Sequence, residues 1–509
     1  MTGRTARFSA DESPIRCAGP TTCAWPTKVL LSAIFALAAG VAGADKFVYR
    51  DEAGKRVEVE ARVVGSAEGV GVLELADGQY RVVPSQAVEK RDRAEGPEPM
   101  LPDAIAAALA KQFGQERFRS IVQAPFVMGL VLAGPLPRGS EARATNFLQQ
   151  VAVFMKNVDA AFSRFVKEAR IPARPPRFPL VVLIFEGRPD FEKYVEPTLY
   201  GSEVPTTRIG GFYSKLTNYL AVRLDECRTY DVVLHEAIHQ QSYNRNVLKR
   251  LAPVPSWFDE GIATGFEANQ GKISVGPGKI SLRYAEQALA GSNLPWEQML
   301  VDESVFAQAD LLSEAYGNAW GLHWLLVTRY KPQYGEYLRR LSQKKPLGKD
   351  TSDDRLNDFR EAVGKEPEIL HKEFLPALKA GMKRQKVSRP AEEPPGYVLR
   401  NINQGEVKLY VVERHVQVGM AEAARVDAHG SLTNTSPLRA MTFRVSMQHA
   451  AGLTAEWLVP NLGIMKTQSL PLQSLPLRPG AGAGQRTFRV EIESALPDSP
   501  EAQQWQRGK

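Results

Sequence analysis

Two histidines separated by three residues, His235 and His239, constrain the fold more than any other feature of this 509-residue chain. In a helix, residues four apart project from one face about one turn apart, so both imidazoles can reach a single metal ion. Apolar residues lead into the motif over 230–234, and Ala237 and Ile238 fill its interior. This pattern predicts a largely buried helix, in which a histidine needs a partner or a metal. We therefore expect a zinc site on this helix.

A third ligand is needed, because catalytic zinc usually has three protein ligands and one open position. Residues 240–245 contain no histidine that could complete the set. Residues 253–256, Pro-Val-Pro-Ser, predict a turn that ends at the start of a second helix. Glu260 then falls in the first turn of that helix and is the expected third ligand. Its neighbour Asp259 should point about 100° away, so only one of the two can face the metal. Glu236, directly after the first histidine, is placed to act on a metal-bound water.

Glu267 lies two helical turns beyond Glu260, on the same face of the second predicted helix. One interpretation is that its carboxylate hydrogen-bonds a ligand histidine and fixes the ring. The other interpretation is an ordinary surface charge. The sequence leaves both open.

These motifs resemble a known family. His-Glu-x-x-His followed by Trp-x-x-Glu-Gly-x-Ala at 257–263 is similar to the gluzincin (peptidase MA-like) zinc metallopeptidases, which include the thermolysin and aminopeptidase N families. With the flanking segments, residues 100–385 most closely resemble exported bacterial peptidase-like proteins of unknown function. The resemblance implies a Zn²⁺ ion held by His235, His239 and Glu260, with Glu236 as the catalytic carboxylate.

The resemblance also suggests which group stabilises the oxyanion. Tyr316 opens an apolar helix and is similar to an aminopeptidase N tyrosine with this role. Thermolysin-like enzymes use a histidine instead, which makes His323 on the same predicted helix the alternative. A plain core or capping role for Tyr316 is a third interpretation. The aminopeptidase N glutamate that binds the substrate amino terminus has no counterpart in residues 210–214, Gly-Gly-Phe-Tyr-Ser. An endopeptidase is therefore expected rather than an aminopeptidase.

The amino terminus predicts export. Residues 29–43 form an apolar run behind Lys28 and end in small residues, which is typical of a signal peptide over 1–44. No second apolar run is long enough to span a membrane. We expect a product in the periplasm or outside the cell. Removal of residues 1–44 leaves Cys227 as a single cysteine, which excludes an intramolecular disulfide.

The expected fold class is α+β multidomain. The predicted parts are a signal peptide at 1–44, an SH3-like β module at 45–92, a mainly helical gluzincin-like metallopeptidase domain with a small sheet at 98–384, and a C-terminal β-sandwich at 396–509. A charged, Pro-rich linker is expected over 91–102. The β module could bind peptide or cell wall, or serve as a passive spacer.

The central part should contain a long amphipathic helix over 144–169, a hairpin led by residues 210–214, and strands over 178–185 and 218–224. By resemblance to gluzincins, the strand at 218–224 should be the edge strand that pairs with substrate backbone.

Two classes of function fit these features. The first is an exported zinc-dependent peptidase that acts on a peptide or protein substrate, with a cell-envelope component among the candidates. The second is an envelope binding or scaffold protein whose zinc site is structural or degenerate. Residues 331–390 carry fifteen Lys and Arg against nine Asp and Glu, a surplus that suits a solvated helix surface or an acidic envelope partner. No nucleic-acid motif accompanies it.

Overall fold

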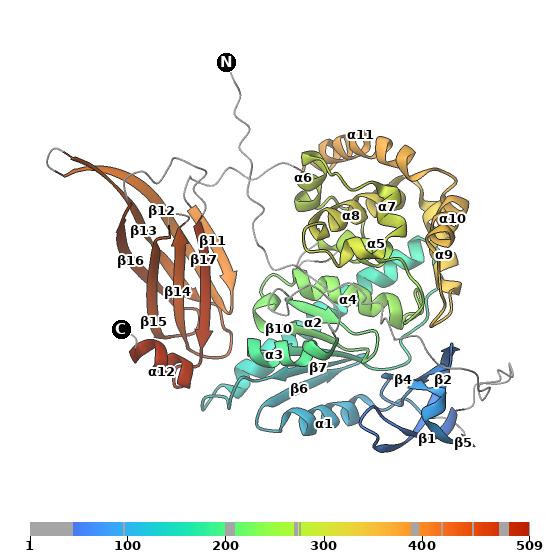
Figure 1. Ribbon diagram of the computed structural model, residues 1–509. Helices are drawn as coiled ribbons and strands as arrows, with labels where there is room; N and C mark the ends of the chain where they lie inside the picture. The colour runs from blue at the N-terminus through green and yellow to red at the C-terminus, as the bar shows by residue number, and fades with distance from the viewer. Residues whose placement is uncertain are drawn as a thin grey trace.

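A computed structural model of the protein confirms the α+β multidomain fold class. Figure 1 shows the N-terminal and C-terminal sheets on opposite sides of a larger central part. The structure describes residues 44–94, 97–198, 209–268, 273, 276–387, 397–418, 421–449, 452–477 and 488–507. The predicted signal peptide lies outside these residues except for Ala44. Among the described helices, none is long and apolar enough to cross a membrane.

Five antiparallel strands form the N-terminal sheet, in the order β4-β3-β2-β1-β5. Their bounds are β1 Ala44–Arg50, β2 Arg56–Ala67, β3 Val70–Glu74, β4 Tyr80–Pro84 and β5 Val88–Ala94. Alternating apolar residues such as Phe47 and Leu73 build its small core. The predicted linker start at residue 91 is wrong, because β5 pairs with β1 through Ala94. A charged segment can form an edge strand, which is exposed along one side.

The central sheet has the order β6-β7-β8-β10-β9, in which β7, β8 and β10 are parallel and the outer strands are antiparallel. Its strands are β6 Phe118–Gln123, β7 Phe126–Val131, β8 Leu180–Phe185, β9 Gly211–Tyr213 and β10 Leu220–Arg223. Its helices are α1 Pro102–Phe113, α2 Glu141–Glu168 and α3 Arg188–Val195. All six residues of β8 are buried, as expected for a central strand covered on both faces.

The identity of the edge strand corrects a prediction. β10 occupies the segment expected at the edge, but it lies between β8 and β9. The edge is β9, from the stretch that sequence analysis assigned to a hairpin, and β9 and β10 do form an antiparallel pair. Sequence pattern cannot order strands within a sheet, because the order depends on which segments pair, and β10 pairs with β8 from a distant part of the chain.

Within the described residues, eight α-helices follow, and they share one apolar core with the central sheet. They are α4 Asp231–Asn244, α5 Ser256–Glu267, α6 Leu282–Ala290, α7 Trp296–Val301, α8 Leu312–Arg329, α9 Lys331–Gln343, α10 Ser352–Val363 and α11 Pro367–Gln385. Figure 1 shows α4 next to the central sheet and α5 and α8 farther from it.

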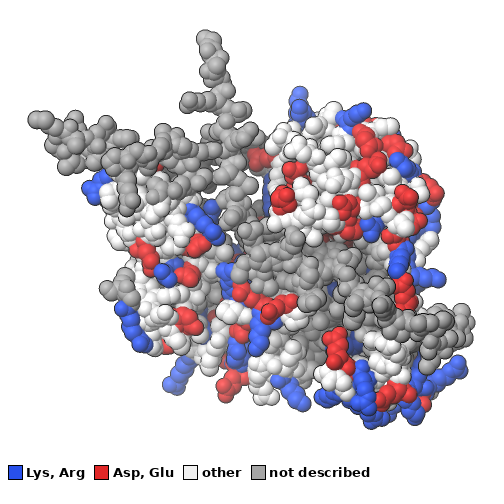
Figure 2. All heavy atoms as spheres, viewed as in Figure 1, with Lys and Arg blue, Asp and Glu red and all other residues white. Residues whose placement is uncertain are grey.

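The basic surplus of residues 331–390 does not form a uniformly basic face in the view of Figure 2, where Lys and Arg alternate with Asp and Glu over the helical part. Many of these charges pair along or between helices. Arg340 contacts Glu336 and Glu361, and Lys365 contacts Glu373. This pattern favours a solvated helix surface.

The C-terminal part contains two antiparallel sheets, β11-β12-β13-β16 and β15-β14-β17, which enclose one apolar core. Leu409 and Val426 come from the first sheet, and Phe443 and Trp457 from the second. The elements are β11 Tyr397–Ile402, β12 Gly405–Val418, β13 Ala421–Asn434, β14 Met441–His449, β15 Thr454–Leu462, β16 Thr467–Pro476, β17 Phe488–Ala495 and α12 Pro500–Arg507.

A buried ion pair joins the C-terminal sheets to the central part. The Arg439 guanidinium donates to Glu186 Oε2 at 3.0 Å and to the Gly134 carbonyl at 3.1 Å. Both Arg439 and Glu186 are at most 5% exposed. Gln404 also donates to the Glu186 carbonyl at 2.8 Å.

We expect Arg439→Met to destabilise the protein by about 3–5 kcal/mol, because it leaves the Glu186 carboxylate buried without its cation. Arg444→Met is the matched control, since Arg444 forms a more exposed pair with Glu456 and such pairs contribute little. Chemical denaturation of both variants checks the difference. Equal stabilities would show that the buried pair is dispensable.

Candidate metal centre

Three side chains from two successive helices converge on one point. His235 and His239 come from α4 and Glu260 from α5, and one ligand atom of each lies within 4.8 Å of the others. His235 Nε2 is 3.1 Å from both His239 Nε2 and Glu260 Oε2, and His239 Nε2 is 3.6 Å from the same oxygen. Donors about 2.0–2.1 Å from a tetrahedral ion lie roughly 3.3 Å apart. The three predicted ligands are buried together and could hold a metal ion.

The position of α5 fixes Glu260. The helix begins at Ser256, whose backbone N–H donates to Glu303 at 3.0 Å and so satisfies one free donor of the first turn. All of α5 is buried. A Cβ at Gly261 would lie only 3.0 Å from the Ala319 carbonyl of α8, so glycine permits this close approach. Glu260 is therefore held against α4 by packing on the other side of its helix.

The interpretation of Glu267 as a carboxylate that hydrogen-bonds a ligand histidine is confirmed. Glu267 Oε1 lies 2.8 Å from His235 Nδ1. The Tyr284 hydroxyl donates to both Glu267 oxygens at 3.2 Å. Since Nδ1 of His235 is engaged by a carboxylate, its Nε2 is the nitrogen left to face the ion.

We expect Glu267→Gln to weaken metal affinity by about 10- to 100-fold, the usual cost of losing a carboxylate behind a ligand histidine. Competition with a chromophoric chelator measures the change. Glu368→Gln, on the exposed start of α11, is the control and should leave the dissociation constant unchanged. An unaltered constant in Glu267→Gln would contradict the assigned role.

Asp259 supports the second histidine, a role that sequence analysis missed. Asp259 Oδ1 lies 3.0 Å from His239 Nδ1, while Oδ2 accepts from the Tyr243 hydroxyl at 2.7 Å. The Lys215 ammonium lies 2.8 Å from Oδ2. The prediction that Asp259 points away from the ligand position agrees with this arrangement. The available signal was that each ligand histidine needs an acceptor on its second nitrogen.

The charges of the cluster favour a cation at its centre. Burial lowers the pKa of His235, but hydrogen bonds to Glu260 and Glu267 outweigh burial and raise it to about 9. Burial also lowers the pKa of His239, but the negative charges of Asp259 and Glu260 outweigh burial, so the pKa of His239 is raised as well. Positive charge is therefore stabilised at both imidazoles. A divalent cation would supply that charge and displace the protons, as metal binding to histidine requires.

Glu236 lies on the side of α4 that faces the edge strand. Its Oε2 accepts from the Tyr213 backbone N–H of β9 at 2.8 Å, and the side chain is 1% exposed. A Cβ at Gly211 would lie 2.5 Å from Val232 and 3.2 Å from Glu236, so glycine lets β9 approach α4. The carboxylate that follows the first ligand thus has a fixed orientation.

The two candidates for oxyanion stabilisation differ in position. The Tyr316 ring lies 6.2 Å from the His235 ring, centroid to centroid. His323 follows two turns later on α8, about 10 Å along the axis. Its Nε2 lies 3.0 Å from the Tyr334 hydroxyl, and burial lowers its pKa to about 3. The structure thus brings Tyr316, not His323, next to a ligand.

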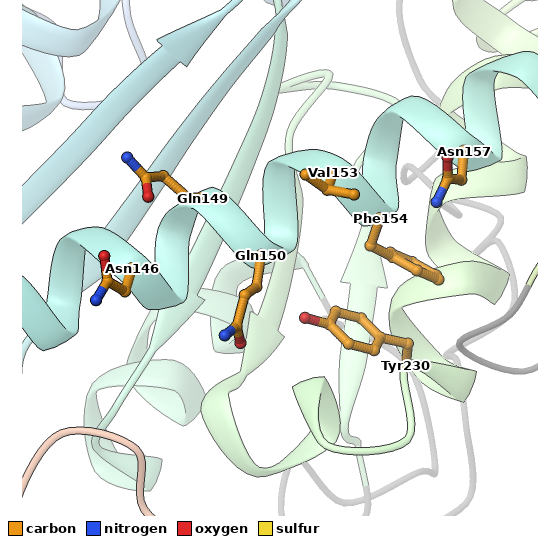
Figure 3. Close-up of a pocket in the computed structure, with 7 residues that line it drawn as sticks. All are labelled: Asn146, Gln149, Gln150, Val153, Phe154, Asn157 and Tyr230. Carbon is orange, nitrogen blue, oxygen red and sulfur yellow. The ribbon is translucent and has the colours of Figure 1, made fainter.

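A separate pocket of about 580 Å³ lies along α2 (Figure 3). Phe154 stacks on Tyr230, with ring centroids 4.2 Å apart, beside exposed amides of the helix. It shares no residue with the histidine cluster. It is lined by Asn146, Gln149, Gln150, Val153, Phe154, Asn157 and Tyr230. These side chains include no carboxylate or imidazole, so the candidate centre is the cluster on α4 and α5.

Comparison with known proteins finds a family model that matches part of the chain. A family described as a protein of unknown function, DUF1570, matches residues 230–348. The match includes α4, α5 and α8, which carry the ligands and Tyr316. No curated protein matches the chain. The similarity is therefore to a family without an assigned activity, and it establishes no peptidase family.

Proposed function

We propose that the protein is an exported zinc-dependent peptidase. The convergence of His235 Nε2, His239 Nε2 and Glu260 Oε2 carries this proposal. Two nitrogens and one oxygen form a ligand set typical of catalytic zinc, whereas structural zinc usually has four protein ligands. Within the described residues, the buried candidate ligand group contains three side chains. This favours catalysis over the alternative of a scaffold with a structural site.

Bound zinc would lower the pKa of a water molecule to about 7 and polarise a carbonyl group. Glu236 takes a proton as the water oxygen bonds to the peptide carbonyl carbon. It would then deliver this proton to the nitrogen as the C–N bond breaks, which leaves a carboxylic acid and an amine. Its hydrogen bond from Tyr213 N–H orients the carboxylate for both transfers.

Tyr316 is the proposed donor to the developing oxyanion, because it adjoins His235 while His323 contacts Tyr334. Removing one such donor typically costs about 10²- to 10³-fold in kcat. We expect Tyr316→Phe to show this loss with zinc still bound, and His323→Gln to keep at least half of the activity of the parent protein. The opposite order would assign the role to His323.

An endopeptidase is favoured over an aminopeptidase. The edge strand β9, Gly-Phe-Tyr, offers no carboxylate to bind a substrate amino terminus. We expect the protein to cleave internal bonds of N-acetylated peptides, which have no free amino terminus.

The test is a proteomic cleavage screen with the purified mature chain. We expect new internal cleavage sites with the zinc-loaded protein, their loss after chelation and their return when zinc is restored. Cleavage only at free amino termini would indicate an aminopeptidase. Stoichiometric zinc without any cleavage would favour the scaffold alternative.

A further inference from the structure

We propose that Lys215 is a positioning residue for the metal centre and that the N-terminal sheet holds it in place. This inference rests on the proposed function. It also assigns a role to the N-terminal sheet, for which the sequence suggested peptide binding, wall binding or a passive spacer.

Lys215 acts on the histidine through Asp259. It lies in the turn between β9 and β10, and its ammonium is 2.8 Å from Asp259 Oδ2. The ammonium also lies over the Tyr243 ring, 4.9 Å from its centre, and the Tyr243 hydroxyl donates to the same oxygen. Asp259 is 2% exposed, so its charge needs a partner. With Oδ2 held by Lys215 and Tyr243, Oδ1 is directed at His239 Nδ1.

The N-terminal sheet holds the β9–β10 turn that carries Lys215. The Tyr80 backbone N–H, at the start of β4, donates to the Leu216 carbonyl at 2.7 Å. Gln79 donates to the Tyr219 hydroxyl at 3.2 Å. The N-terminal sheet thus bonds to Leu216 within the β9–β10 turn and to Tyr219 directly before β10.

Arg250, which follows α4 in the chain, connects the β3–β4 turn with the β9–β10 turn. Its guanidinium donates to the Gly78 carbonyl at 2.9 Å and to the Lys215 carbonyl at 3.4 Å. The guanidinium carbon lies 3.5 Å from the centre of the Tyr80 ring, and Arg250 is 6% exposed. A buried cation with these partners makes a rigid junction. The contacts therefore run without a break from the N-terminal sheet through Lys215 and Asp259 to His239.

This arrangement predicts that two residues remote from the ligands affect metal affinity. In the full mature chain, we expect Lys215→Met to raise the zinc dissociation constant about 10-fold, at the lower end of the effect of losing a partner behind a ligand. Lys215→Arg, which keeps the charge, should stay within about threefold of the parent. Arg250→Met should weaken zinc binding in the same direction. The Lys215→Met/Arg250→Met double variant should lose less than the product of the single effects, because both act through one turn.

Lys46→Met is the control for damage to the N-terminal sheet, since Lys46 forms an exposed pair with Glu58 on the same sheet. It should leave the dissociation constant unchanged. Competition with a zinc chelator gives the dissociation constants of the parent and the five variants, and thermal unfolding of the metal-free proteins separates folding from metal affinity. A Lys215→Met protein that binds zinc as tightly as the parent overturns this inference alone. So does a Lys215→Arg protein that loses as much as Lys215→Met. A parent that binds no zinc overturns the proposed function as well.

Discussion

Glu236→Gln should retain one zinc ion and lose peptide hydrolysis by about 10²- to 10⁴-fold, the usual contribution of a general base. The substitution preserves the size of the side chain and its ability to accept from Tyr213 N–H. It removes the group that takes a proton from water. The three ligands are unchanged, so the metal should remain. Rates on a peptide found in the cleavage screen, with metal content determined in parallel, measure both effects.

The matched control for Glu236→Gln is Glu168→Gln, which makes the same change at an exposed residue at the end of α2. It should leave Glu236 in place and hydrolysis measurable. A Glu236→Gln protein that cleaves as fast as its parent would exclude this carboxylate as the base. Loss of metal from that variant would instead indicate that Glu236 supports the ion.

Glu260→Ala should abolish stoichiometric metal binding. Removal of one of three ligands leaves two histidines, so we expect affinity to fall by more than the roughly 100-fold upper cost of losing a supporting carboxylate. Zinc per chain after dialysis should drop from one to near zero. Truncation of the buried Glu260 side chain also leaves a cavity, which lowers the stability of the variant even without metal. Thermal unfolding of the metal-free parent and the metal-free variant therefore accompanies the metal analysis.

A second acidic group provides the control for Glu260→Ala. Glu297, Glu366 and Glu368 lie close enough together to be considered as ligands, but they are half-buried or exposed and include no histidine. Arg360 also contacts Glu366 at 2.7 Å. Glu366→Ala should therefore retain the zinc. If Glu260→Ala keeps its zinc and Glu366→Ala loses it, the metal centre lies at Glu297, Glu366 and Glu368 instead.

The sequence predicted the local features of the site because they depend on short-range geometry. Helical spacing placed His235 and His239 on one face, and the Pro-Ser turn set the start of α5 and hence the position of Glu260. The same spacing brought Glu267 to His235.

Long-range features could not be predicted from the pattern. Asp259 reaches His239 only because α5 packs across α4 at one particular angle, and no spacing rule gives that angle. The order of β9 and β10 depends on which of them pairs with β8, a strand from a distant part of the chain. The contact of Arg250 with the N-terminal sheet joins residues separated by more than 170 positions. A single sequence contains no signal for such an encounter.

Cobalt substitution tests the central claim most directly, because the absorption of bound Co²⁺ reports both its coordination and exchange of an external ligand. We predict one Co²⁺ per chain, with visible bands typical of a four- or five-coordinate site that shift when a small thiol is added to the open position. Absence of a stoichiometric site would contradict the account, as would bands that no added ligand alters.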